Sequence, residues 1–196
     1  LIAIMGKNGA DLPLPQEMVD NWEINISGLV NQPYTAKLKD LIAEAEAEGA
    51  SVTKISKIHC LDNMPGGGGI SNVEITGIPL NWLIERGGGL KDGVTGVTID
   101  RREFHTNGEQ DHSTRGTAPE KFDDVYLVYK IGGEPLNVSA GAPCINWSEA
   151  NDAQGNVKQC VGYHFTDEDK DWAAISENGF DSYDEGPYMN KPNVTT

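Results

Sequence analysis

The amino-acid sequence predicts an α+β domain in which short strands are interspersed with two helices. Two observations carry this prediction: apolar residues alternate with polar ones in several short segments, and only two segments show helical spacing. The segments do not follow a strict strand-helix-strand order, so a regular parallel α/β sheet is not expected. With 196 residues, 38% of them hydrophobic, the chain fits a single domain with one sizeable core. We expect that core over about residues 22–165, followed by an acidic, irregular tail over 166–196.

The first elements are a strand and a helix. Residues 21–28, "NWEINISG", alternate Trp22, Ile24 and Ile26 with polar residues, which is typical of a half-buried strand. Residues 34–49 are predicted to form a helix with Thr35 as N-cap, ending at Gly49. Its apolar residues fall at the helical spacing i, i+3, i+4 and i+7: Leu38, Leu41, Ile42 and Ala45.

The next segments predict two more strands and a second helix. Strands are expected over 51–60, where the chain runs into Cys60, and over 73–80, which ends in a turn. Pro79 stands where a helix can begin, and "LNWLIERGGG", residues 80–89, predicts one short amphipathic helix closed by glycines.

The remaining segments predict three strands and a long loop. A strand over 93–100 is followed by a polar loop over 101–120, which has no sustained period. Residues 125–131 form a largely apolar strand before the Gly132-Gly133 turn. The last strand is "GNVKQCVGYHF", residues 155–165, in which one face is expected to carry the alternate residues Val157, Gln159, Val161 and Tyr163.

The charge of the chain excludes some classes of partner. A formal net charge of −15 and a pI near 4.5 argue against nucleic-acid binding, because a phosphate backbone requires clustered Lys and Arg. No apolar run approaches the ~18 residues of a membrane span. The acidity and the low Lys+Arg count of 15 favour an extracytoplasmic protein, secreted or at the cell surface. The Leu at the start and the "KPNVTT" end leave open a piece of a longer chain with neighbouring domains.

The three cysteines cannot all pair with one another. Cys144 and Cys160 either form a disulfide or remain two buried free thiols, and Cys60 is the odd thiol in both cases. Cys60 ends a strand and precedes Pro65 and a run of four glycines, residues 66–69. No Gly-Lys-Ser/Thr follows this run, so it is not a phosphate-binding P-loop. It is either a solvated flexible loop or a segment that lets something large approach the sulfur.

The residues themselves bear on three further kinds of site: a zinc site, a Cys/His hydrolase site and an anion site. The histidines and cysteines do not show zinc-type spacing, and nothing locates the partners that a Cys/His hydrolase would need around Cys60. The densest cationic stretch runs from Arg101 and Arg102 to Arg115. It either holds an anion or forms a charged loop whose arginines pair with surrounding Asp and Glu.

Five segments, in this order and spacing, resemble the molybdopterin-binding domain of the sulfite oxidase family. The resemblance extends from about Trp22 to Phe165 and implies that family's fold, with mixed β-sheets and a few short helices. The segments are "NWEINISGLVNQPYTAKLKDLIA", "IHCLDN", "ITGIPLNWLIERGG", "YLVYKIGGEPLNVSAGAPCI" and "GNVKQCVGYHF".

The resemblance implies a molybdenum-molybdopterin cofactor and the residues that would hold it. Cys60 would supply a thiolate to molybdenum, a soft donor that suits a metal changing its oxidation state. Lys158 would contact the pterin phosphate as a point charge. The resemblance also points to Asn63 and Asn8 as cofactor contacts. In an oxidoreductase domain, Arg101, Arg102 or Arg115 of the cationic stretch would face an oxyanion substrate.

Two functions from different classes remain open at this point. The first is an oxidoreductase domain that carries out oxygen-atom transfer or a related reduction on a small molecule or oxyanion. The second is a cofactor-free extracytoplasmic binding or structural module that keeps the same fold. The second rests on Cys144 and Ile145 standing where the family has an arginine, and on Ser139-Ala140 where it has a histidine.

Overall fold

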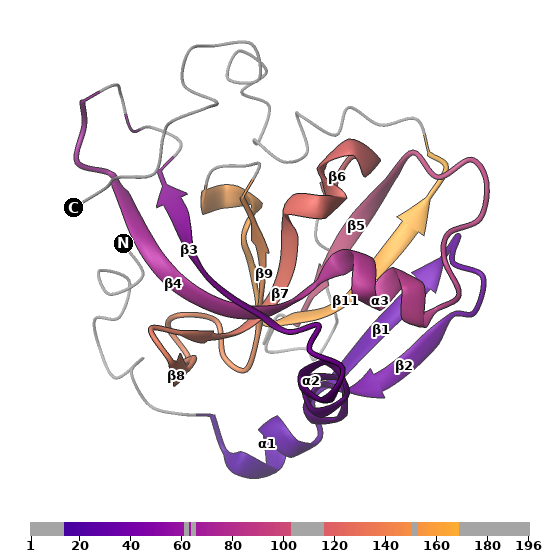
Figure 1. Cartoon of the computed structure of the whole chain (residues 1–196), viewed down its shortest axis with the longest axis horizontal. Coiled ribbons are helices and arrows are strands. Elements are labelled where there is room, and N and C mark those ends of the chain that lie inside the picture. The colour runs from indigo at the N-terminus through magenta and orange to yellow at the C-terminus, as the bar shows by residue number, and fades with distance from the viewer. Residues whose placement is uncertain (1–13, 61–62, 64–65, 103–115, 150–152, 169–196) are drawn as a thin grey trace, which may run out of the picture.

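The structure is a computed structural model that describes residues 14–60, 63, 66–102, 116–149 and 153–168. Two β-sheets form the body of the domain, with short helices beside them (Figure 1). One sheet contains a parallel pair of strands among antiparallel ones, and the other is antiparallel. This arrangement confirms the predicted α+β class with mixed sheets.

The first sheet joins the two ends of the described chain. Strand β1 pairs in parallel with β11, with Asn25 opposite Gly162, and antiparallel with β2. Ile24 and Ile26 of β1 are fully buried, as their alternation predicts. In sheet order the strands are β2 (Tyr34–Lys37), β1 (Glu23–Gly28), β11 (Cys160–Thr166), β5 (Gly96–Arg101) and β6 (Gly116–Thr117).

The second sheet carries the long hairpin of β3 and β4, which curves across the domain in Figure 1. In sheet order its strands are β10 (Val157–Lys158), β9 (Ile145–Ser148), β7 (Val125–Ile131), β4 (Ile70–Pro79) and β3 (Val52–His59). A sixth strand, β8 (Glu134–Pro135), pairs with β7 through the predicted Gly132-Gly133 turn.

Two hydrophobic clusters fill the domain. The larger one lies against the first sheet and the helices and includes Trp22, Leu41 and Phe165. The smaller cluster belongs to the second sheet, and we call it the second cluster; it consists of Ile58, Ile75, Tyr126, Val128, Leu136, Ala140, Ala142, Ile145 and Trp147. Alternate residues of β7 belong to different clusters, Val125 and Leu127 to the larger one and Tyr126 and Val128 to the second cluster, so β7 lies between the two.

The helices are short, and the first predicted one begins later than expected. Residues 34–37 form strand β2 instead of a first helical turn, because pairing with β1 satisfies their backbone groups. Lys37 therefore stands at the N-cap, and Thr35 lies within the strand, which corrects that prediction. Gly49 follows the helix with φ +69°, as expected. The helices are α1 (Gln16–Asp20), α2 (Leu38–Ala47), α3 (Leu80–Arg86) and the 3-10 helices η2 (Pro119–Asp124) and η3 (Ala153–Gly155).

Other boundaries also differ from the sequence-based expectations. Strand β4 begins at Ile70, three residues before the predicted start, and strand β9 was not predicted. Within the predicted loop over 101–120, Gly116–Thr117 pairs with β5 and residues 119–124 are helical; residues 103–115 lie outside the described residues. In the parts of the chain that the structure describes, no helix has the length and apolar character needed to cross a membrane.

The predicted strand over 155–165 is two strands that belong to different sheets. The chain breaks at Gln159, which has φ +55°, and the pairing of β11 with β5 shifts register between Cys160 and Gly162. This break reverses part of the predicted alternation, because Cys160 is buried whereas Gln159 and Val161 are only half-buried. A strand periodicity cannot continue through a left-handed residue. The chain thus passes from the second sheet to the first at Gln159.

The parallel pair of strands depends on Gly28. Its φ is +79°, and a Cβ at this position would lie 2.0 Å from the carbonyl oxygen of Phe165. We expect Gly28→Ala to lower the free energy of unfolding by at least about 3 kcal/mol, through backbone strain and the clash together. Gly49→Ala is the matched control because Gly49 has a similar φ of +69° but open space around it. It should cost only about 1 kcal/mol. Urea denaturation measures both, and equal losses would contradict the role of the clash.

Candidate functional site

Cys60 is the first residue after the paired part of the β3–β4 hairpin. The last pair in the hairpin is His59 with Ile70. Beyond it, the backbone N–H of Cys60 donates a hydrogen bond of 2.8 Å to the carbonyl of Gly69. The thiol is free and partly exposed. The glycine run therefore returns directly to the residue that carries the sulfur.

Asn63 closes the same loop from within. Its Oδ1 accepts a hydrogen bond of 2.8 Å from the backbone N–H of Gly69, and its own N–H donates to the carbonyl of Cys60. A Cβ on Gly69 would lie 3.0 Å from Asn63 Oδ1, so only glycine leaves ordinary space there. Gly66, with φ +78°, has open space around it. The structure thus gives Asn63 a role in fixing the loop around Cys60, and the predicted cofactor contact of Asn63 stays a prediction.

Lys158 lies on β10, at the other edge of the second sheet from β3. Its ammonium donates a hydrogen bond to the carbonyl of Ser139, and burial lowers the pKa of Lys158. Gly141, with φ +104°, lies against the side chain, and a Cβ there would be 2.8 Å from Lys158 Cβ and Cγ. Among the described residues Lys158 makes no ion pair with a carboxylate. Within the described residues, the hydrogen-bond partner of the ammonium is therefore a backbone carbonyl.

The turn that presents the Ser139 carbonyl is held by Asn137. Asn137 Oδ1 accepts hydrogen bonds from the backbone N–H of Ala140, at 2.8 Å, and from the hydroxyl of Ser139, at 2.9 Å. Side-chain oxygens of Asn commonly stabilise turns in this way. The turn leads into Gly141, whose N–H donates to the carbonyl of Val138. This turn was not predicted from the sequence, although Asn137 and Gly141 are a local signal for one.

Two of the three arginines predicted to face a substrate, Arg101 and Arg102, lie at the crossover between the sheets. Arg101 pairs with Cys160 in the first sheet. The backbone N–H of Arg102 donates to the carbonyl of Gln159, and its guanidinium carbon lies 5.5 Å from the centre of the Trp22 ring. Gln159 N–H in turn donates to the carbonyl of Gly141. Arg102 and the Lys158 region are thus joined through the backbone, whereas Arg115 and Asn8 lie outside the described residues.

Residues near Cys60 and near the Lys158 side chain belong to the same apolar cluster. Ile58, two residues before Cys60, belongs to the second cluster. So do Ala140 and Ala142, on either side of the glycine that packs against Lys158. One apolar cluster therefore includes a residue near Cys60 in the chain and the two neighbours of the glycine that packs against Lys158.

Cys144 and Cys160 are fully buried free thiols, so the structure contains the second of the two arrangements considered from the sequence. The thiol of Cys144 lies 3.3 Å from the carbonyl oxygen of Cys160, which also accepts a hydrogen bond from the Trp22 indole N–H. Burial raises the pKa of Cys160 to about 12 and raises that of Cys144 well above its usual value. Cys60 is the one cysteine of the three that is not buried.

The protein's own donors set what kind of metal site Cys60 can form. Across the described ranges, no three or more His, Cys, Asp or Glu side chains are grouped to hold a metal ion. A metal bound at Cys60 would therefore take most of its ligands from a cofactor, with one soft thiolate from the protein. A metal-pterin group with its own dithiolene sulfurs fits this donor set, and the ammonium of Lys158 fits a phosphate.

Comparisons with known proteins agree with this fold and donor set. The family model described as "Oxidoreductase molybdopterin binding domain" matches residues 11–171. A search of curated proteins found no match. Among solved structures, the chain resembles the sulfane dehydrogenase SoxCD from Paracoccus pantotrophus, with a TM-score of 0.65 and 21% sequence identity. The similarity covers 84% of this chain and 42% of that one, so this chain spans less than half the length of that relative.

The difference in burial between the thiols predicts their reactivity. We expect a neutral alkylating reagent to modify Cys60 in the folded protein and to leave Cys144 and Cys160 intact, because the reagent and the thiolate both need access to solvent. All three cysteines should react after unfolding in urea. Peptide mass spectrometry counts the modified sites. Equal modification of all three in the folded state would contradict the described burial.

The raised pKa of Cys160 predicts a loss of stability at alkaline pH. The folded state keeps this thiol neutral up to about pH 12, whereas the unfolded chain ionises it near its usual value. Its contribution to stability is therefore complete below about pH 8.5 and is lost as the pH rises toward 12, by about 1.4 kcal/mol per pH unit. Cys160→Ala should show a correspondingly shallower loss between about pH 9 and pH 11 in urea titrations. An unchanged slope would contradict the assignment.

Proposed function

The chain belongs to the oxidoreductase molybdopterin binding domain family, and we propose that it binds a molybdenum-molybdopterin cofactor through Cys60 and Lys158. The observation that carries the proposal is that Cys60 is not buried and that Lys158 pairs with no carboxylate of the described residues, while residues near both belong to one apolar cluster. When bound, the cofactor supplies two-electron redox chemistry and a centre for oxygen-atom transfer. The roles below are those of the protein's own residues.

Cys60 serves as the single protein ligand to the metal in this proposal. A thiolate is a soft donor, and coordination to a metal deprotonates the thiol outright. The hydrogen bonds from Cys60 N–H to Gly69 and from Gly69 N–H to Asn63 hold the backbone of the loop. The backbone position from which the Cys60 side chain extends is therefore fixed. The open space around Gly66 leaves room for a bulky group to approach.

Lys158 serves as the phosphate contact. A lysine ammonium carries three donors, and the carbonyl of Ser139 takes one of them. The two remaining donors can bind an anionic oxygen while the Asn137 turn keeps the Ser139 carbonyl in place. Gly141 lets the turn close against the lysine stem without a side chain between them. The domain carries a net charge of −15, so a positioned cation is the principal attraction for a phosphate here.

The arginines of the crossover serve an anionic substrate in this proposal. The guanidinium of Arg102 lies over Trp22, Arg101 is the last residue of β5, and the backbone of Arg102 bonds Gln159, the residue after Lys158. Together with Arg115 they would attract a small molecule or oxyanion for oxygen-atom transfer or a related reduction. The similarity to a protein described as a sulfane dehydrogenase supports a sulfur compound as the first class to test.

The location and the context of the domain also belong to the proposal. The acidic composition supports an extracytoplasmic place. The match to only 42% of the solved relative supports neighbouring domains in a longer protein. No observation favours the cofactor-free module that the sequence left open.

Metal analysis tests the proposal directly. We expect protein made in a host that synthesises molybdopterin to contain molybdenum and to release a fluorescent pterin on denaturation. Cys60→Ser should lose the metal while remaining folded, because a hydroxyl is a poor ligand for this centre. Lys158→Met should weaken retention of the pterin by about 10- to 100-fold, the effect expected for one charge-assisted hydrogen bond.

The control lysine is Lys130, which lies on β7 with its ammonium 3.9 Å from a carboxylate oxygen of Glu46. Lys130→Met should retain metal and pterin at the wild-type level. A folded wild-type sample from a competent host with neither metal nor pterin would overturn the proposal. Circular dichroism establishes folding in each case.

A further inference from the structure

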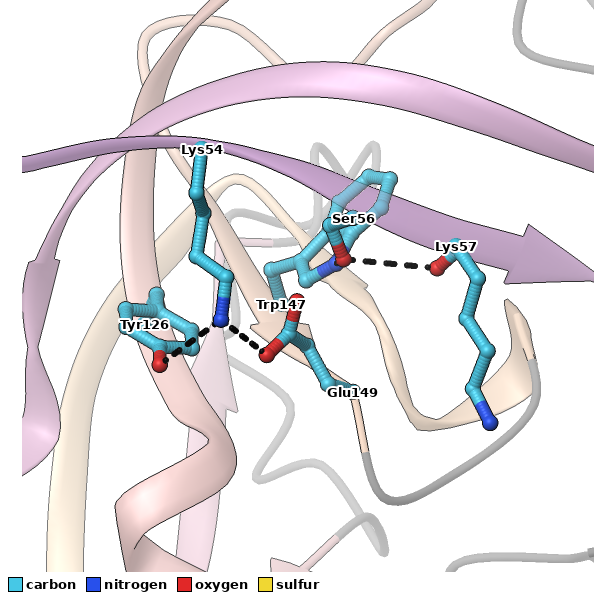
Figure 2. A network of polar contacts seen from close by, with 6 residues as sticks. All are labelled: Lys54, Ser56, Lys57, Tyr126, Trp147 and Glu149. Atoms are coloured by element: carbon cyan, nitrogen blue, oxygen red, sulfur yellow. Dashed lines mark hydrogen bonds and ion pairs between the residues drawn. The ribbon is translucent and has the colours of Figure 1, made fainter. Parts of the chain in front are cut away.

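A half-buried lysine links β3 to two strands that are not its neighbours in the sheet (Figure 2). Lys54 Nζ donates a hydrogen bond of 2.6 Å to Glu149 Oε2 and one of 3.4 Å to the hydroxyl of Tyr126. It also lies 5.0 Å from the centre of the Tyr126 ring. The side chains of Lys54 and Glu149 are 35% and 17% exposed, so the ion pair is shielded more than a typical surface pair. Burial would lower the pKa of Lys54, but its bonds to Glu149 outweigh burial and raise it.

A second link lies two residues further along β3. The indole N–H of Trp147, on β9, donates a hydrogen bond of 2.8 Å to the hydroxyl of Ser56. Both residues are buried almost completely. Ser56 Oγ in turn donates to the carbonyl of Lys57 at 3.4 Å. An indole N–H needs a partner when it is buried, so this contact fixes the distance between the two strands.

These contacts require a strongly curved sheet. In sheet order, β4 and β7 stand between β3 and β9, yet the side chains of β3 reach Trp147 and Glu149. A register shift between Thr76 and Gly77 of β4 supplies a bend. A Cβ on Gly77 would lie 3.0 Å from the carbonyl oxygen of Leu127, so glycine allows the close approach there. The hairpin thus folds over the sheet, as its curved ribbons show in Figure 1.

The side chains that make these links stand in one row that leads to the thiol. Successive side chains of a strand point to opposite faces, so Lys54, Ser56 and Ile58 share a face of β3. Ile58 packs in the second cluster with Tyr126 and Trp147. Figure 2 shows Lys57 directed away from Lys54 and Glu149. Cys60 follows Ile58 by two residues, immediately beyond the last paired residue.

The other side of the links leads to Lys158. Trp147 lies on β9, and β9 pairs with β10 so that Ile145 is opposite Lys158. The hydrogen bond between Trp147 and Ser56 therefore joins the strand that ends at the thiol to the strand pair that carries the ammonium.

We propose that the pairs Lys54–Glu149 and Ser56–Trp147 form a latch that sets the place of Cys60 relative to Lys158. The four residues are positioning residues, since they act through the strand and not on a substrate. This inference rests on the proposed function, because a metal-pterin group would have to reach from the Cys60 thiolate to the Lys158 ammonium. The effect of the latch on the thiol is independent of any cofactor and can be measured without one.

Alkylation of Cys60 by iodoacetamide, a neutral reagent, tests the latch in the cofactor-free protein. The other two cysteines are buried, and peptide mass spectrometry assigns the modified site. We expect Lys54→Met, Glu149→Gln and Ser56→Ala each to raise the rate at Cys60 by about 3- to 10-fold, because the strand end opens more often. The double variant Lys54→Glu/Glu149→Lys keeps the net charge and should return the rate to within about twofold of wild type.

The matched control removes an ion pair of similar exposure elsewhere. Arg86 Nε bonds both carboxylate oxygens of Glu44, between α3 and α2, and the two side chains are 30% and 38% exposed. Glu44→Gln should lower Tm about as much as Glu149→Gln but leave the alkylation rate of Cys60 unchanged. An equal acceleration by Glu44→Gln would overturn the proposal, because the effect would then reflect general destabilisation. Unchanged rates in all three latch variants would overturn it too. If Lys54→Met does not fold, Glu149→Gln and Ser56→Ala decide the matter.

Metal retention separates this proposal from the proposed function. After loading with molybdenum and pterin, the Glu149→Gln variant should retain the metal for a shorter time than wild type. The charge-swapped double variant should retain it as long as wild type does. If the wild-type protein takes up no metal, the proposed function fails and the latch is judged by the alkylation rates alone. If the rates change as expected but loaded variants retain metal like wild type, the latch acts on the thiol without serving the cofactor, and that part of the proposal is overturned.

Discussion

The left-handed backbone at Gln159 is the constraint on which the rest of the domain depends. It ends β10 in the second sheet and lets β11 begin in the first, with no loop between them. The N–H of Gln159 donates a hydrogen bond to the carbonyl of Gly141, and its carbonyl accepts one from the N–H of Arg102. The segment around Gly141 and the end of β5 are therefore both held at this residue. At the next residue, the carbonyl of Cys160 accepts a hydrogen bond from the indole N–H of Trp22. The two sheets, the lysine turn and the arginines of the candidate site therefore share one fixed point.

The sequence predicted those parts of the fold that rest on local patterns. Ile24 and Ile26 alternate with polar residues over the whole of β1, and the apolar run before Gly132-Gly133 is β7. The sequence-based prediction was wrong where strand pairing overrides a local preference. Thr35 is a residue type that often caps helices, but it pairs with Asn25 of β1 in a strand. Four residues were too few to identify β9. The break at Gln159 left no signal, because a residue other than glycine rarely adopts a positive φ.

The candidate site was predictable only in part, for a related reason. Cys60 and Lys158 were predicted from the resemblance to a family, and the structure adds what surrounds them. The contact of Gly141 with Lys158 and the bond from Trp147 to Ser56 join residues far apart in the chain. Periodicity and motifs report neighbours along the sequence, and such contacts appear only after the sheets have curved. The turn at Asn137 was the exception, since Asn and Gly at a short spacing signal a turn locally.

The parallel pairing of β1 with β11 has a consequence for how the protein is made. A ribosome releases β1 early, but its central partner is among the last described strands to emerge, and Ser27 meets His164 across 137 positions. Contacts so distant in sequence are slow to form and come after local hairpins. The β3–β4 hairpin with Cys60 can assemble during synthesis, whereas the lysine strand and the crossover wait for the end of the domain. Maturation of any bound group is therefore a late event, confined to the completed chain.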